Sequence, residues 1–179
     1  MMIALAGRRI DAADAAQRRF PFQNLHRVKE DIRTLFIELK PQTLVCSAAN
    51  GADLLALEAA QDLSIDTHIV LPFAPEIFRN TSVVDRPGGW GKRFDHALKI
   101  VRSHENLILM DCPEHGPSAY LATNAKIIAE AQDIARRLHT TVTAVVVWDG
   151  QSRGAHDITS EFRHAALRAC LQIKEICTL

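Results

Sequence analysis

The chain has 179 residues, of which 47% are hydrophobic and 23% charged, and its 21 Lys and Arg residues balance its 21 Asp and Glu residues. This composition is that of an ordinary globular protein with enough chain for a full core, so we predict one domain over residues 1–179. The zero net charge makes nucleic acid an unfavoured partner, and no apolar run is long enough to span a bilayer.

Short apolar runs alternate along the chain with segments of helical periodicity. We predict strands over residues 3–6, 44–47, 68–72, 107–110 and 142–148, and a final edge strand over 171–176. Helical stripes lie over 25–39, 55–63, 121–138 and 158–169, and a further helix starts near Trp90. Several strands are continuously apolar, as in parallel sheets covered on both faces. The sequence therefore predicts an α/β fold, a doubly wound, mainly parallel Rossmann-like sheet with helices on both faces.

Two irregular stretches interrupt this pattern, over residues 7–22 and 73–91. Both follow predicted strands, and the second is rich in Pro and Gly. In open parallel sheets, the loops that leave the carboxyl ends of the strands line the ligand crevice. We therefore expect both stretches to be binding loops.

Small residues follow the second predicted strand and lead directly into a helix. The turn contains Ser47, Asn50 and Gly51, and Asp53 lies in the first helical turn. A helix N-terminus offers free N–H groups and a positive dipole end, and glycine permits close approach, so we expect a phosphate or ribose here. Asn50 can equally be the N-cap with Asp53 as its capping-box partner, a role that needs no ligand.

Basic residues follow several predicted strands: Arg8 and Arg9 after the first, Arg79, Arg86, Lys92 and Arg93 after the third, and Arg153 after the fifth. We expect this set to contact the ligand, and we assign Arg8, Arg9, Arg79, Arg93 and Arg153 to the site. Because the carboxyl ends of parallel strands share one edge, these cations can converge although the net charge is zero. Guanidinium groups suit bidentate binding of phosphate. The alternative is that each arginine is solvated or pairs with a nearby carboxylate such as Asp85 or Asp95.

Two further segments are predicted to complete the site. The turn after the fifth strand contains Asp149, Gly150 and Gly154, and it brings a second helix N-terminus to the crevice. Asp149 can bind a ribose hydroxyl or simply start the turn. Tyr120 and Asn124 are one helical turn apart, so they can read a base together, or Tyr120 can be a partly buried core residue.

Chemistry at this site is less clearly indicated. Glu58 and Glu161 are weak candidates for a general acid or base, although a solvated helix position explains both. Cysteine and histidine spacing suggests no metal site, and we expect no cofactor. The four scattered cysteines favour a reducing, cytoplasmic location.

The motifs described above resemble, in their order and spacing, the SLOG superfamily. They are residues 6–11 (AGRRID), 47–53 (SAANGAD), 71–73 with 78–83, 90–94, Tyr120 with Asn124, and 147–150 ahead of Gly154. This Rossmann-like group includes the DprA/Smf proteins, the LOG-type cytokinin phosphoribohydrolases and ligand-sensing domains of bacterial defence systems. The resemblance covers most of the chain and implies recognition of a nucleotide or nucleotide-derived molecule.

Members of the group either bind and signal or cleave a nucleoside monophosphate to base and ribose phosphate. The enzymes carry a Pro-Gly-Gly-x-Gly-Thr-x-x-Glu element, but this chain has Ala155 and Ile158 in place of its Thr and Glu. We therefore favour a binding domain for a nucleotide-derived signal, in defence or stress signalling. Its output would be self-association or an effector protein partner. The alternatives are a nucleotide N-glycosidase and a DprA-like DNA-processing protein.

The predicted ligand site consists of Gly7, Arg8, Arg9, Ser47, Asn50, Gly51, Asp53, Arg79, Arg93, Tyr120, Asn124, Asp149, Gly150, Arg153 and Gly154.

Overall fold

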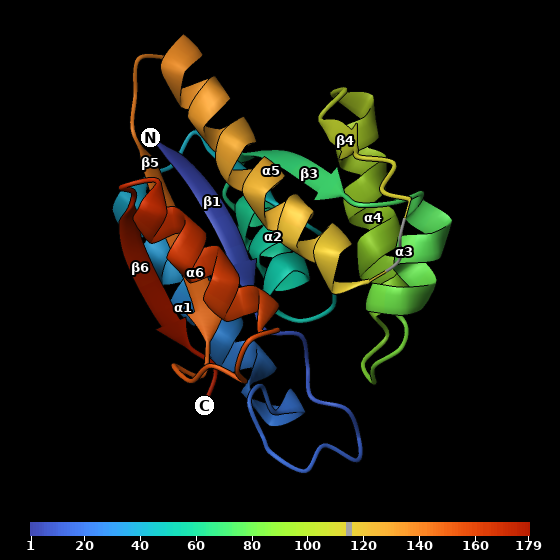
Figure 1. The fold of residues 1–179 in the computed structure, drawn as a ribbon. Helices are drawn as coiled ribbons and strands as arrows, with labels where there is room; N and C mark the ends of the chain where they lie inside the picture. The colour runs from blue at the N-terminus through green and yellow to red at the C-terminus, as the bar shows by residue number, and fades with distance from the viewer. Residues whose placement is uncertain (114–115) are drawn as a thin grey trace.

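The computed structural model describes residues 1–113 and 116–179. Its strands are β1 (Met2–Gly7), β2 (Thr43–Cys46), β3 (Asp66–Leu71), β4 (Leu107–Leu109), β5 (Val142–Trp148) and β6 (Gln172–Cys177). They form one sheet in the order β4-β3-β2-β1-β5-β6, and every pair is parallel (Figure 1). The predicted strands are thus confirmed, with ends that differ by one or two residues.

Helices cover both faces of this sheet, as predicted. They are α1 (Leu25–Leu39), α2 (Ala52–Asp62), α3 (Pro75–Ser82), α4 (Trp90–Ser103), α5 (Pro117–Arg137) and α6 (Ile158–Arg168), with a 3₁₀ turn, η1 (Phe22–Asn24), ahead of α1. Figure 1 shows α5 and α6 in front of the sheet and α1 and α2 behind it. Within the described residues, no helix is both long and apolar enough to cross a membrane.

The alternation of side chains along β1 separates two hydrophobic layers. Ile3 and Leu5 pack in a core with residues of α1, α2 and α4. Met2 and Ala4 point to the other face and pack with residues of α5 and α6. Because successive side chains of a strand point to opposite faces, a strand buried on both sides reads as a continuous apolar run.

The direction of strand succession reverses beside β1. From β1 the chain proceeds through β2, β3 and β4 on one side, and then crosses over to place β5 and β6 on the other. In open α/β sheets such a switch point opens a crevice at the carboxyl ends of the strands, because the connecting helices lie on opposite faces. Here that position is the end of β1 beside β5, where Gly7 pairs with Val147.

Gly7 allows the start of α2 to come close to this switch point. A Cβ atom on Gly7 would lie 2.4 Å from the Cβ of Ala52 and 2.6 Å from the carbonyl oxygen of Val147. Any larger residue would therefore push α2 away from β1. Gly7 thus fixes how near the N-terminus of α2 lies to the crevice.

The structure corrects the expectation of an irregular stretch over residues 73–91. This segment contains α3, which begins at Pro75 with Glu76 in its first turn. Proline is favoured in the first helical turn because its missing N–H has no partner there in any case. The apolar side of α3 is held by Phe78, whose ring stacks on that of Phe94 with centroids 6.0 Å apart. The stripe is too short for its periodicity to be recognised in the sequence.

Candidate functional site

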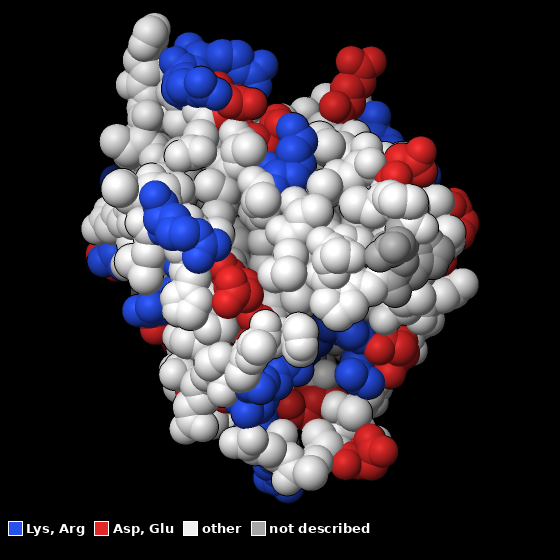
Figure 2. Space-filling view, in the orientation of Figure 1, with Lys and Arg blue, Asp and Glu red and all other residues white. Residues whose placement is uncertain are grey.

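A cavity of about 420 Å³ opens at the carboxyl ends of β1 and β2. Its lining comes from the loop after β1, the turn after β2, α3 and the loop after it, the first half of α5, and the turn between β5 and α6. The cavity is thus at the topological switch point, where a ligand site is expected in this architecture. Figure 2 shows basic side chains gathered on both sides of a hollow in the lower half of the view.

Eight of the predicted site residues line this cavity. They are Gly7, Arg8, Arg9, Ser47, Asp53, Tyr120, Asn124 and Arg153. They come from five separate places in the sequence, so the shared edge of the parallel sheet does bring them together.

Arg8 is the most buried charged residue of the lining, with 3% of its surface exposed. Its Nε donates to Asp149 Oδ1 at 2.8 Å, its Nη1 to Asp157 Oδ1 at 2.6 Å, and its Nη2 to the carbonyl oxygen of Gln151 at 2.6 Å. Burial alone lowers the pKa of Arg8, but the hydrogen bonds with Asp157 and Asp149 outweigh this effect and raise the pKa. All three guanidinium nitrogens are therefore committed to protein partners.

Asp157 is the second anchor of this network, because it is also the N-cap of α6. Its Oδ1 accepts from the backbone N–H groups of Thr159 at 3.1 Å and Ser160 at 3.2 Å. Burial raises the pKa of Asp157, but the hydrogen bonds from Arg8 and from backbone N–H groups lower it to about 2. The carboxylate therefore stays ionised and holds the β5–α6 turn against the end of β1.

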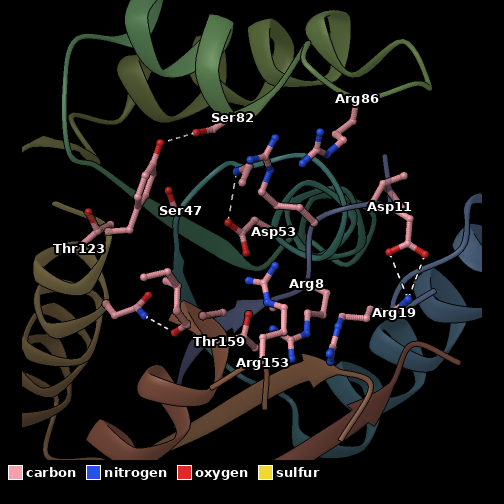
Figure 3. A pocket seen from close by; sticks show the side chains of 18 of the residues that line it. Arg8, Asp11, Arg19, Ser47, Asp53, Ser82, Arg86, Thr123, Arg153 and Thr159 are labelled. Carbon is pink, nitrogen blue, oxygen red and sulfur yellow. Dashed lines mark hydrogen bonds between the residues drawn. The ribbon is translucent and has the colours of Figure 1, made fainter. Parts of the chain in front are cut away.

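Two more arginines, Arg19 and Arg153, share these carboxylates with Arg8. Arg19 Nη1 lies 2.6 Å from Asp149 Oδ2, and Arg153 Nε lies 3.7 Å from Asp157 Oδ2. Burial and the neighbouring charges of Arg8 and Arg19 lower the pKa of Arg153. We call Arg8, Arg19 and Arg153 the lower arginine cluster, since Figure 3 shows them together below Asp53. Three guanidinium groups on two carboxylates leave one positive charge in excess.

A second group, the upper arginine cluster, consists of Arg9 and Arg86, which share the carboxylate of Asp85. Arg9 Nη2 makes a short contact with Asp85, and Arg86 Nη1 lies 3.7 Å from Asp85 Oδ2. The Nε atoms of Arg9 and Arg86 are buried and have no hydrogen-bond partner in the described structure. This cluster also carries one positive charge in excess, so an anion would be stabilised at either end of the cavity.

Asp53 lies between the two arginine clusters on the cavity floor (Figure 3). Its Oδ2 accepts from the backbone N–H of Ala49 at 3.2 Å. Burial raises the pKa of this carboxyl to about 7, although the hydrogen bond from Ala49 and the charge of Arg9 act in the opposite direction. Asp53 is therefore partly protonated near neutral pH.

Tyr120 and Asn124 form part of the cavity wall on α5. The Tyr120 hydroxyl lies 2.9 Å from Ser82 Oγ, and its ring meets Phe73 edge-on at 5.8 Å. Asn124 Nδ2 donates to the carbonyl oxygen of Ile158 at 2.8 Å. The Tyr120 ring lines the cavity as predicted, whereas the Asn124 amide group is occupied in joining α5 to the start of α6.

The predicted cradle at Asn50 and Gly51 packs against protein instead of lining the cavity. Asn50 is 1% exposed, and its Nδ2 donates to the carbonyl oxygens of Ser82 at 3.0 Å and Val83 at 3.2 Å. Gly51 has a φ of 91°, and a Cβ there would lie 2.6 Å from the carbonyl oxygen of Arg8. Asn50 is not the N-cap of α2, because Gly51 takes that position. Both residues join the loops that frame the cavity.

Arg79 and Arg93 were expected at the ligand, but their side chains lie elsewhere. Arg79 pairs with Asp95 at 2.9 Å on the outer side of α3 and α4. The Arg93 guanidinium lies over the Trp90 ring at 4.7 Å and 3.4 Å from Glu58. The helical phase of α3 and α4 directs both arginines away from the crevice, although the segment that carries them follows β3.

The remaining predicted residues also lie outside the cavity lining. Asp149 is buried beneath Arg8, and Gly150 and Gly154 form the β5–α6 turn with positive φ angles of 76° and 100°. Glu58 pairs with Lys29 at 3.1 Å on the surface of α2, and Glu161 lies beside His164 on α6. Neither glutamate is therefore placed to act on a ligand in this cavity. No metal-binding group of His, Cys, Asp or Glu exists among the described residues.

Several lining residues were not predicted, among them Asp11, Arg19, Ser82, Thr123 and Thr159, whereas Arg86 belongs to the set of basic residues expected to converge at this edge. Arg86 lies in the loop that follows α3. Arg19 lies in the loop after β1, where the Asp11 carboxylate accepts hydrogen bonds from the backbone N–H groups of Arg19 and Phe20 and so folds the loop back. Their contribution depends on how these loops fold back. The sequence signal that points to them is their position within the two predicted binding loops.

Comparisons with known proteins give matches among solved structures alone. No family model matches the sequence, and no curated protein matches it. Among solved structures, the chain is similar to DNA processing protein A (DprA) from Streptococcus pneumoniae, with 17% identity and a TM-score of 0.39. The match covers 97% of this chain and 57% of the DprA chain.

The chain has a Rossmann-like fold, as its resemblance to the SLOG superfamily implies. The order of the parallel strands and the helices on both faces establish this. The chain spans little more than half of DprA's length.

Replacing Arg8 by Met should destabilise the fold strongly, because Asp149 and Asp157 then stay buried without their cation. We expect the free energy of unfolding to fall by about 3–5 kcal/mol in urea denaturation. Arg79→Met is the matched control, since it breaks an exposed pair and should leave the free energy of unfolding nearly unchanged. Equal losses in the two variants would contradict a structural role for the Arg8 network.

Asp53→Asn should remove a pH dependence of stability. The carboxyl pKa is 3.8 unfolded and about 7 folded, so the folded wild type loses stability as pH rises from about 4 to about 7. Relative to the wild type, the variant should gain on the order of 4 kcal/mol across this range. Urea denaturation at pH 4 and pH 8 measures the difference, with the exposed-carboxylate variant Glu161→Gln as the control. A pH-independent difference would show that the Asp53 pKa is not raised.

Proposed function

We propose that the cavity binds a nucleotide or a nucleotide-derived signal molecule. The observation that carries this proposal is the pair of arginine clusters, each with one more guanidinium group than carboxylate groups, at the switch point of the parallel sheet. Phosphate suits the planar donors of arginine. The volume of about 420 Å³ falls in the range of small-molecule sites.

The cavity wall supports the nucleotide character of the ligand. Tyr120 presents an aromatic ring to the cavity, and the nearly fully buried Phe78 and Ile127 lie behind the same lining. A base can pack on such surface while its phosphate meets an arginine cluster. The ligand we propose therefore has an aromatic part and an anionic part.

Binding is favoured over hydrolysis because of the position of the carboxyl groups. The two glutamates considered as general acids or bases lie away from the cavity. Asp53, however, lines the cavity and has a pKa of about 7, as a general acid or base requires. A nucleotide N-glycosidase is therefore the second candidate function. Chromatography of the mixtures from the titration below separates the two, since only a glycosidase releases free base.

At least one of Arg153→Ala and Arg86→Ala should weaken the binding of a ribonucleoside monophosphate, because its single phosphate meets one of the two arginine clusters. Calorimetric titration with AMP, GMP, CMP and UMP identifies the tightest of the four for the wild type. Loss of the charge-assisted contact should reduce its affinity about 10-fold or more in the variant of the cluster that holds the phosphate.

Arg79→Ala is the control for this experiment, because it removes an arginine of the same charge outside the cavity. Its affinity should equal that of the wild type. Failure of all four nucleotides to bind, or a loss of affinity in Arg79→Ala alone, would contradict the proposed site.

A further inference from the structure

Two polar side chains on the cavity floor, Asp53 and Ser47, each have an oxygen atom without a hydrogen-bond partner among the described residues. Asp53 is 7% exposed and uses Oδ2 for the Ala49 N–H, while no hydrogen bond to its Oδ1 exists among the described residues. Ser47 Oγ is buried and has no hydrogen-bond partner in the described part of the chain. Both residues line the cavity, one from the end of β2 and the other from the first turn of α2.

The turn that leads into α2 accounts for one oxygen of Asp53, because Ala49 lies before the Gly51 N-cap and donates its N–H to Oδ2. A carboxylate that reaches back to the N–H of Ala49 needs a single acceptor atom. Buried polar groups are paired in nearly all proteins, so the unpaired Ser47 hydroxyl, in a cavity that Asp53 also lines, indicates a polar ligand group.

The charges around Asp53 and Ser47 determine which kind of ligand group can bind between them. A phosphate is repelled by the ionised form of Asp53 and finds better donors in the arginine clusters on either side. A metal cation is disfavoured by the same arginines, and the described residues contain no group of three ligands. A neutral donor is left, and a hydroxyl group can donate to Asp53 Oδ1 and accept from Ser47 Oγ.

Arg9 does not satisfy Asp53, although its positive charge is near enough to lower the pKa of this carboxyl. Its guanidinium group makes its short contact with Asp85 instead. Asp53 Oδ1 is therefore available on the cavity side. Figure 3 shows Asp53 facing the space between the two arginine clusters.

We propose that Asp53 and Ser47 form a subsite for sugar hydroxyl groups, which selects a ribose-containing phosphate over its deoxy counterpart. This inference rests on the proposed function, since the phosphate of the same molecule would lie against an arginine cluster. The chemical class of ligand is thus a phosphorylated sugar with a free vicinal diol. The deoxy form should bind more weakly, because it lacks the hydroxyl that donates to Asp53 and would leave this carboxylate buried without a hydrogen-bond donor.

Calorimetry with three forms of the tightest ribonucleoside monophosphate tests this subsite. The probes are the nucleotide itself, its 2′-deoxy form and its 3′-deoxy form, titrated into the full chain. For the wild type, removal of at least one of the two hydroxyls should reduce affinity about 10-fold or more. In Asp53→Asn, which keeps the shape of the side chain, the three probes should bind alike within about threefold. Ser47→Ala should reduce the discrimination in the same direction.

Glu161→Gln is the matched control, because it neutralises a carboxylate outside the cavity and should keep the wild-type discrimination. Equal affinity of the three probes for the wild type, or full discrimination in Asp53→Asn, would overturn the subsite while the proposed function stands. Failure of all probes to bind the wild type would contradict the proposed function itself. Thermal unfolding of each variant shows that a lost preference does not come from a lost fold.

Discussion

The buried interaction of Arg8 with Asp149 and Asp157 is the constraint on which the site depends. It joins the end of β1 to the β5–α6 turn, at the point where the order of the strands reverses. Charges this deeply buried are stable only when they are paired and hydrogen-bonded, so the three residues must fold together. The N-cap of α6 belongs to the same network through Asp157, and the position of that helix is fixed with it.

This constraint also separates structural charge from charge that is free for a ligand. Arg8 has no guanidinium nitrogen left for a ligand, although it lines the cavity. The excess positive charge therefore lies on its neighbours, above all Arg153, which is only weakly paired at 3.7 Å. On the opposite side, Arg9 and Arg86 compete for the single carboxylate of Asp85. A protein of zero net charge can in this way place two arginine clusters around one cavity, whose lining also contains the carboxyl groups of Asp11 and Asp53.

The sequence predicted the fold and about half of the proposed site, and the physical reasons for the division are clear. Apolar runs identify buried parallel strands, and the common edge of such strands brings Arg8, Ser47 and Arg153 together. Side-chain direction within α3 and α4 was not predictable, because the register of each helix depends on its tertiary packing; Arg79 and Arg93 were therefore misplaced. The roles of Arg19 and Arg86 depend on how long loops fold back, and loop paths carry no periodic signal in the sequence.

Ligand binding at the cavity arginines is tested most directly by a measurement on the arginine side chains themselves. An NMR titration of the Nε–Hε resonances with the tightest ribonucleoside monophosphate reports which guanidinium groups meet the ligand. We expect the resonances of the cluster that holds the phosphate, either Arg9 with Arg86 or Arg153, to shift to saturation while those of Arg79 and Arg93 stay in place. Shifts confined to Arg79 and Arg93, or none at the cavity arginines, would contradict the proposed ligand site.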